Sequence, residues 1–140
     1  MFKIKQDLNV FIRGDIAIRP SSVHGIGVFA TKDIPAHVCI EVCPAVVFSK
    51  DLLTGWHEEM RYPHILSSHV FIHRSGADGH AIVLGYGSIY NHNIENNAIF
   101  RWSENIPEAM EFWSIREIKK DEEIFTRYCN RKEDEWFWVD

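Results

Sequence analysis

Short apolar runs separated by turn residues dominate the pattern of hydrophobic and polar positions along the chain. The runs are rich in Val, Ile, Phe and Cys, residues that half-buried strands favour, and Gly, Pro, Asn and Asp lie between them. They cover residues 10–12, 16–19, 27–30, 38–42, 45–48, 70–73, 80–84, 98–102, 111–114 and 123–128. The pattern therefore predicts a mainly β, β-rich fold of many short strands.

One segment, residues 51–68, departs from this pattern. Leu52, Trp56 and Met60 recur there at helical spacing, with charged residues between them. Pro63 should end such a helix, because the residue before a proline is pushed away from the helical conformation. We therefore expect short helices in addition to the strands, with one in this segment.

Length and composition indicate a single domain. A chain of 140 residues, 46% of them hydrophobic, can bury one sizeable core but not two ordinary ones. The net charge of -5 argues against direct nucleic-acid binding, which needs basic surface. No apolar run has the length of a signal peptide or a membrane span. We expect an intracellular, soluble protein with no membrane association.

The cysteines and histidines predict no metal site. The three cysteines, Cys39, Cys43 and Cys129, form no C-x-x-C pair, so they indicate neither a disulfide framework nor a zinc site. His69 and His73 are four residues apart, but they lie in a segment with strand and loop character and have no recognisable third ligand. Packing or solvated roles are favoured for both residue types.

Three motifs carry candidate chemistry. The segment His24-Gly25-Ile26-Gly27 has two glycines around one residue, which lets the backbone approach a ligand closely, although such a tripeptide alone is more often a turn. Asn91-His92-Asn93 has turn composition, since Asn side chains bond their own backbone there. Tyr128 ends the run Glu-Glu-Ile-Phe-Thr-Arg-Tyr, where a lone tyrosine would usually be a core residue with a bonded hydroxyl.

In their order and spacing, these motifs resemble the SET-domain family of methyltransferases, in the compact bacterial or viral type. The match is His-Gly-Ile-Gly-Val-Phe-Ala at 24–30, the segment leading to Asn-His at 81–92, and the approach to the final strand at 115–124. The resemblance covers about residues 16–139. It implies several small sheets and a C-terminal pseudoknot, in which the strand that ends at Tyr128 passes through a loop starting at the Asn-His pair.

The resemblance also implies the domain limits. We expect one SET domain over residues 1–140, with an N-terminal extension and first strand at 1–15 and a short aromatic C-terminal tail at 129–140.

S-adenosylmethionine is the methyl donor that the resemblance implies, with no metal. The Asn-His pair would help to hold its methionine and adenine parts, and an aromatic residue of the tail would pack on the adenine. The expected cofactor-binding residues are His24, Gly25, Ile26, Gly27, Asn91, His92, Tyr128, Trp136 and Phe137.

Tyr128 is the expected catalytic residue. In the family such a tyrosine lies at the meeting point of the methyl donor and a lysine channel, and Tyr86, Phe100 and Trp136 are the expected channel residues. A tyrosine at position 100 could hold a water molecule or the amine, whereas phenylalanine leaves more room. We therefore predict that more than one methyl can be added, with an ordinary core phenylalanine as the alternative reading of Phe100.

The function implied is methyl transfer to the side-chain amine of lysine in a protein, with histones among the candidates. The alternative is a catalytically weak SET-like module that binds a lysine-containing peptide, because Asn93, Thr126 and Arg127 depart from the family pattern. A homodimer is a further expectation, since one compact domain has little surface with which to complete a peptide groove. The expected location is the cytoplasm, or the nucleus of a host cell if histones are the substrate.

Overall fold

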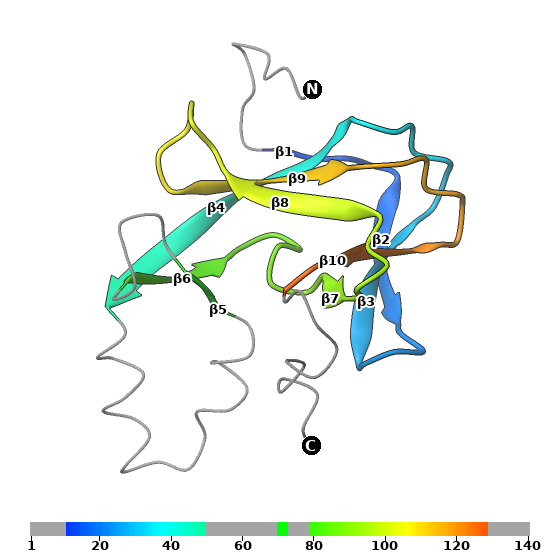
Figure 1. The fold of residues 1–140 in the computed structure, drawn as a ribbon, viewed down its shortest axis with the longest axis horizontal. Helices are drawn as coiled ribbons and strands as arrows, with labels where there is room; N and C mark the ends of the chain where they lie inside the picture. Colours follow the sequence, from blue (N-terminus) through cyan, green and yellow to red (C-terminus); the bar gives the residue numbers. More distant parts are fainter. Residues whose placement is uncertain (1–10, 50–69, 73–78, 129–140) are drawn as a thin grey trace.

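The computed structural model describes residues 11–49, 70–72 and 79–128. The expected helix within 51–68 and the aromatic tail at 129–140 lie outside these residues. The described part consists of ten strands and the loops between them, and it contains no helix (Figure 1). It thus has no helix of the length and apolar character needed to cross a membrane. The prediction of a β-rich fold is confirmed.

The larger of two sheets carries one wall of the core. Its strands run in the order β5-β6-β4-β9-β8, and β1 pairs with β4 beside this path. All neighbours in it are antiparallel. The bounds are β1 Phe11–Ile12, β4 Cys39–Ser49, β5 Val70–Ile72, β6 Gly79–Val83, β8 Ala98–Trp102 and β9 Ala109–Ser114.

The smaller sheet brings together segments from both ends and the middle of the described chain. Its order is β2-β3-β10-β7, with bounds Ile16–Pro20, Ile26–Ala30, Glu123–Thr126 and Asn91–His92. The orange β10 lies between the blue β3 and the green β7 in Figure 1. Strand β10 is antiparallel to β3 but parallel to β7. Residues far apart in the sequence therefore meet at this sheet.

Strand β4 corrects one expectation. Separate strands were expected at 38–42 and 45–48, but a single strand runs through Pro44. Pro44 is the last residue of β4 paired with β9, and Ala45 is the first paired with β6. A proline lacks the N–H that a central strand position needs. It is accommodated here because it lies where β4 exchanges one neighbour for another.

The core lies between the two sheets and includes both residues of an isolated β-bridge. Ile34 and Ile118, both fully buried, exchange backbone hydrogen bonds of 2.7 and 2.9 Å across two loops. The first of these loops contains His37, a residue with an unusual backbone conformation. His37 has a φ of 60°, in the left-handed region that glycine adopts without a steric penalty.

Candidate functional site

The side-chain amide of Asn91 is the centre of the candidate site. Its Nδ2 donates to the carbonyl oxygens of His24 and Ile26, each at 3.0 Å, and to Oε1 of Glu123 at 2.8 Å. The two amide hydrogens thus serve three acceptors, so one hydrogen is shared between two of them. Asn91, although on the two-residue β7, holds the glycine-rich segment and β10 together. The structure brings three of the predicted segments to one place.

Gly27 is needed where β3 packs against β10. A Cβ at this position would lie 1.9 Å from Oε1 of Glu123 and 3.0 Å from Nδ2 of Asn91. The Glu123 carboxylate cannot swing away freely, because Ser21 Oγ donates to its other oxygen at 2.8 Å. Glycine at 27 therefore makes room for a buried, hydrogen-bonded carboxylate. A cofactor contact through the Gly27 backbone stays a prediction.

Gly25 differs from Gly27 in its surroundings. Its φ is 50°, and a Cβ built on it would meet nothing within 4 Å. His24, Gly25 and Ile26 are all exposed, with Ile26 at 50%. The backbone of residues 24–26 is therefore fixed on one side by Asn91 and open on the other. A fixed, open backbone of this kind is able to receive a ligand that needs close main-chain approach.

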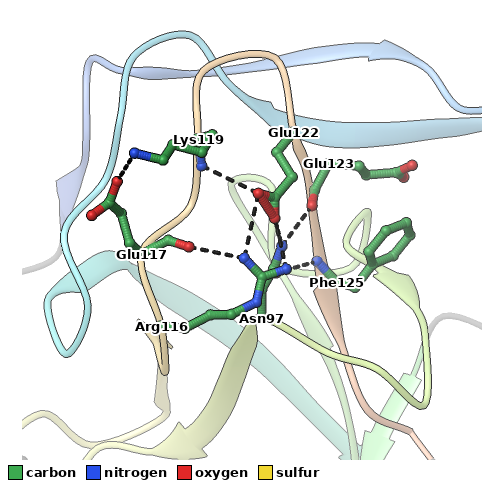
Figure 2. Close-up of polar contacts among 7 residues, drawn as sticks. All are labelled: Asn97, Arg116, Glu117, Lys119, Glu122, Glu123 and Phe125. Atoms are coloured by element: carbon green, nitrogen blue, oxygen red, sulfur yellow. Dashed lines mark hydrogen bonds and ion pairs between the residues drawn. The ribbon is translucent and has the colours of Figure 1, made fainter.

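The loop after β7 is fastened to β10 by Asn97, which is 1% exposed (Figure 2). Its Oδ1 accepts from the Phe125 N–H at 2.8 Å, and its Nδ2 donates to the Glu123 carbonyl at 2.8 Å and to Glu122 Oε2 at 3.1 Å. The amide thus replaces a neighbouring strand for two backbone groups of β10. Hydrogen bonds from β7 and from Asn97 together hold β10 in place, while a threaded pseudoknot stays a prediction.

Tyr128 is held at two points, by His92 of β7 and by Tyr90, which precedes β7. Its backbone N–H donates to Nδ1 of His92 at 2.8 Å, and its hydroxyl donates to the carbonyl oxygen of Tyr90. The first bond takes Tyr128 out of the strand ladder, so β10 ends at Thr126, short of the expected 128. Of the two residues before Tyr128, Thr126 is buried and Arg127 exposed.

The hydroxyl of Tyr128 stays protonated at neutral pH. The residue as a whole is 36% exposed, but its hydroxyl bonds to the carbonyl of Tyr90, which is 1% exposed. Burial raises the pKa of Tyr128. Because the proton points at the Tyr90 carbonyl, the oxygen faces any other group as an acceptor. This hydroxyl suits orientation and weak acceptance rather than proton transfer.

The two predicted channel residues in the described chain lie beside the core. Phe100 is partly buried. Its ring centroid lies 4.9 Å from that of Phe71, in an edge-on arrangement, and 6.1 Å from that of Phe112. Phe112 stacks at 4.4 Å on Tyr90, whose carbonyl receives the Tyr128 hydroxyl. Tyr86 is half-buried and packs against the same core. Phe100 is thus connected to the Tyr128 site through Phe112 and Tyr90, whose rings stack on each other.

Two predicted residues, Trp136 and Phe137, lie outside the described residues. Across the described ranges, no three His, Cys, Asp or Glu side chains come together in a group that could hold a metal ion. Glu123 and Ser21 were not singled out from the sequence. Their charge and polarity beside the glycine-rich segment and the final strand were the available signal.

Comparisons with known proteins identify the family and the fold of the chain. The β-rich fold is that of a SET-type methyltransferase. The SET-domain model matches residues 25–129. The chain therefore belongs to the SET-domain family, as the sequence predicted.

Relatives of known name are found by sequence and by structure. The chain is 32% identical over 117 residues to a histone-lysine N-methyltransferase of Schizosaccharomyces pombe specific for H3 lysine-37, a match that spans 84% of this chain and 75% of the relative. A Plasmodium falciparum crystal structure, described as a candidate histone methyltransferase, is 29% identical with a TM-score of 0.63, over 87% of this chain and 99% of that one. The Neurospora histone lysine methyltransferase DIM-5 shares the fold, with a TM-score of 0.62 at 12% identity over 83% and 52% of the chains.

Proposed function

We propose that this protein is an S-adenosylmethionine-dependent methyltransferase that acts on lysine side chains of a protein. The SET family and the histone-lysine methyltransferase relatives agree with this function. The observation that carries it is the fixation of Tyr128, whose hydroxyl and backbone are both bonded to the segment around the Asn-His pair.

The described residues fit the proposed cofactor. S-adenosylmethionine supplies an electrophilic methyl group on a sulfonium. The open backbone of His24, Gly25 and Ile26 would lie along it, and Asn91 fixes that backbone through two carbonyls. Asn91 and His92 are both buried and held by β10, so they would serve the cofactor by keeping the backbone beside it rigid. The proposal for Trp136 and Phe137, packing on the adenine, depends on a tail outside the described residues.

Methyl transfer needs a neutral lysine amine aligned with the methyl group. At pH ~7.4 a lysine with a pKa of ~10.4 loses its proton at a cost of about 4 kcal/mol. An apolar channel lowers this cost, because desolvation disfavours the ammonium form. Tyr86 and Phe100, which pack against the apolar core, are the channel residues we propose among those described. No carboxylate base is required if the proton leaves through water.

Tyr128 contributes by orientation. With its proton committed to the Tyr90 carbonyl, its oxygen can accept weak C–H hydrogen bonds from a polarised methyl, worth about 0.5–1 kcal/mol each. The rate enhancement then comes mainly from alignment and from preorganised oxygens, with no covalent enzyme intermediate.

The substrate we propose is an exposed lysine of a basic protein, with histones first. The Schizosaccharomyces pombe relative is named for H3 lysine-37. A net charge of -5 favours encounter with a basic chain. We further propose that residues 1–140 form one SET domain, that two copies associate, and that the protein acts inside cells, in a nucleus where histones are the substrate.

The test is transfer of labelled methyl from S-adenosylmethionine to histones and to a cell lysate, with products resolved by mass. Methylated lysine in wild-type reactions, absent without enzyme, would support the proposal. Cofactor binding without transfer to any protein would favour the alternative, a SET-like module that binds lysine-containing peptides. The departures at Asn93, Thr126 and Arg127 are what keep that alternative in view.

A further inference from the structure

A buried carboxylate is hydrogen-bonded to Tyr90, the residue whose carbonyl accepts the Tyr128 hydroxyl. Glu41, on β4, is 2% exposed and lies in the otherwise apolar stretch Val-Cys-Ile-Glu-Val-Cys. No ion pair among the described residues includes Glu41. Desolvating an unpaired carboxylate is costly, so such a group persists only when hydrogen bonds compensate it.

Two donors from one short turn provide that compensation. Tyr90 donates its hydroxyl to Oε1 of Glu41 at 2.7 Å, and the backbone N–H of Tyr86 donates to Oε2 at 2.9 Å. Both ends of the turn 86–90 are therefore fixed to a single carboxylate. Gly85, with a φ of 64°, lets the turn approach this closely, since a Cβ there would lie 2.3 Å from Oε2.

The turn connects Glu41 to the proposed catalytic tyrosine. The Tyr90 ring is clamped between the Glu41 carboxylate at its hydroxyl and Phe112, which stacks on its face at 4.4 Å. The carbonyl of the same residue accepts the Tyr128 hydroxyl. Burial and the nearby charge of Glu41 raise the pKa of Tyr90, so its phenol stays a donor.

We propose that Glu41 is a positioning residue for the Tyr128 hydroxyl and acts through Tyr90. This inference rests on the proposed methyltransferase function. Only a carboxylate offers two acceptors to two donors in this place. A glutamine would face one of the donors with its own amide N–H, and the turn would have to shift. A displacement of about 1 Å near reacting atoms can lower a rate by about 100-fold.

Cofactor binding should be spared by such a shift. Asn91 follows Tyr90 in the chain, but its side chain has its own bonds to His24, Ile26 and Glu123. The loss should therefore fall on kcat and leave affinity for the cofactor nearly unchanged. A purely structural role for Glu41 would instead lower stability without changing kcat per folded molecule.

Glu111→Gln is the matched control. Glu111 is a fully buried carboxylate on the adjacent strand β9, and it accepts from Arg101 Nε and Trp113 Nε1, each at 2.9 Å. Its hydrogen-bond and ion-pair partners among the described residues are Arg101 and Trp113, and neither Tyr90 nor Tyr128 is one of them. The same substitution there tests burial and charge without touching the turn 86–90.

The experiment compares Glu41→Gln, Tyr90→Phe and Glu111→Gln by methyl transfer, by S-adenosylhomocysteine binding, and by NMR of tyrosines labelled at the ring carbon bearing the hydroxyl. We expect kcat to fall roughly 10- to 100-fold in the first two variants, with binding within about twofold, while Glu111→Gln keeps kcat within about twofold. The Tyr128 resonance, assigned with Tyr128→Phe, should move in Glu41→Gln and stay in Glu111→Gln.

Wild-type kcat in folded Glu41→Gln, or an unmoved Tyr128 resonance, would overturn the inference. If Glu41→Gln does not fold, Tyr90→Phe carries the same test, because it removes the hydroxyl that Glu41 holds. A wild-type protein that transfers no methyl at all would instead refute the proposed function, and the NMR comparison would still decide the positioning role of Glu41.

Discussion

Replacing Gly27 by alanine tests how the glycine-rich segment is fixed to the final strand. The added Cβ would lie 1.9 Å from Oε1 and 2.8 Å from the carboxyl carbon of Glu123, a separation that no real packing tolerates. The carboxylate must therefore move, and it is held by Ser21 and Asn91, each at 2.8 Å. Gly27→Ala thus breaks bonds as well as adding volume.

The magnitude follows from those contacts. A hydrogen bond to a charged group contributes about 1.5–3 kcal/mol, and overpacking a close-packed site costs about 1–3 kcal/mol. Loss of one bond with partial relaxation gives about 3 kcal/mol in the free energy of unfolding. For a chain of 140 residues this corresponds to a fall in Tm of about 10 °C.

Urea unfolding of Gly27→Ala beside Gly14→Ala measures the effect. Gly14 is the matched control, because its Cβ would meet nothing within 4 Å and its φ is not left-handed. Gly14→Ala should change stability by less than about 1 kcal/mol. In a Glu123→Ala background the cost of Gly27→Ala should also fall below about 1 kcal/mol. Equal effects at the two glycines, or an unchanged cost without the carboxylate, would refute the packing argument.

Three further predictions concern stability and product. Burial raises the pKa of Cys39 from 9.0 to about 12, and it raises the pKa of Tyr90 as well. Stability that is present below about pH 9 should therefore be lost as the pH rises further. Cys39→Ser should flatten this decline in urea midpoints, and an unchanged decline would contradict the contribution of the Cys39 thiol. Glu108 has a φ of 53°, in the left-handed region that strains residues other than glycine. Glu108→Gly should therefore raise the free energy of unfolding by about 0.5 kcal/mol, whereas Glu104→Gly should lower it. A lower free energy of unfolding in both variants would count against backbone strain at Glu108. Phe100→Tyr should reduce the number of methyls per lysine seen by mass, and the wild-type product pattern would indicate a core residue only.

The strand pattern was predictable because alternation and turn residues are local signals. The merger of two expected strands into β4 was not, since the exchange of neighbours at Pro44 depends on the register of β6 and β9. Strand β7 was also missed, because two residues of turn composition become a strand only when β10 lies parallel to them.

The site divides in the same way. Asn91, His92 and Tyr128 could be chosen from motif order, and the structure brings them together. The pairing of Glu41 with Tyr90 joins residues 49 positions apart, and nothing local in the sequence specifies it. A charged residue within an apolar strand was the one available signal, because a buried carboxylate requires partners.

Methyl transfer by Tyr128→Phe, measured beside wild type at saturating S-adenosylmethionine, tests the central claim most directly. The substitution removes the hydroxyl that bonds the Tyr90 carbonyl and leaves the His92 bond to the Tyr128 backbone in place. We predict lysine methylation by wild type, a fall in kcat of about 100-fold in the variant, and nearly unchanged S-adenosylhomocysteine binding. Equal rates in the two proteins would contradict the role assigned to Tyr128, and no lysine methylation by wild type on any protein would contradict the proposed function.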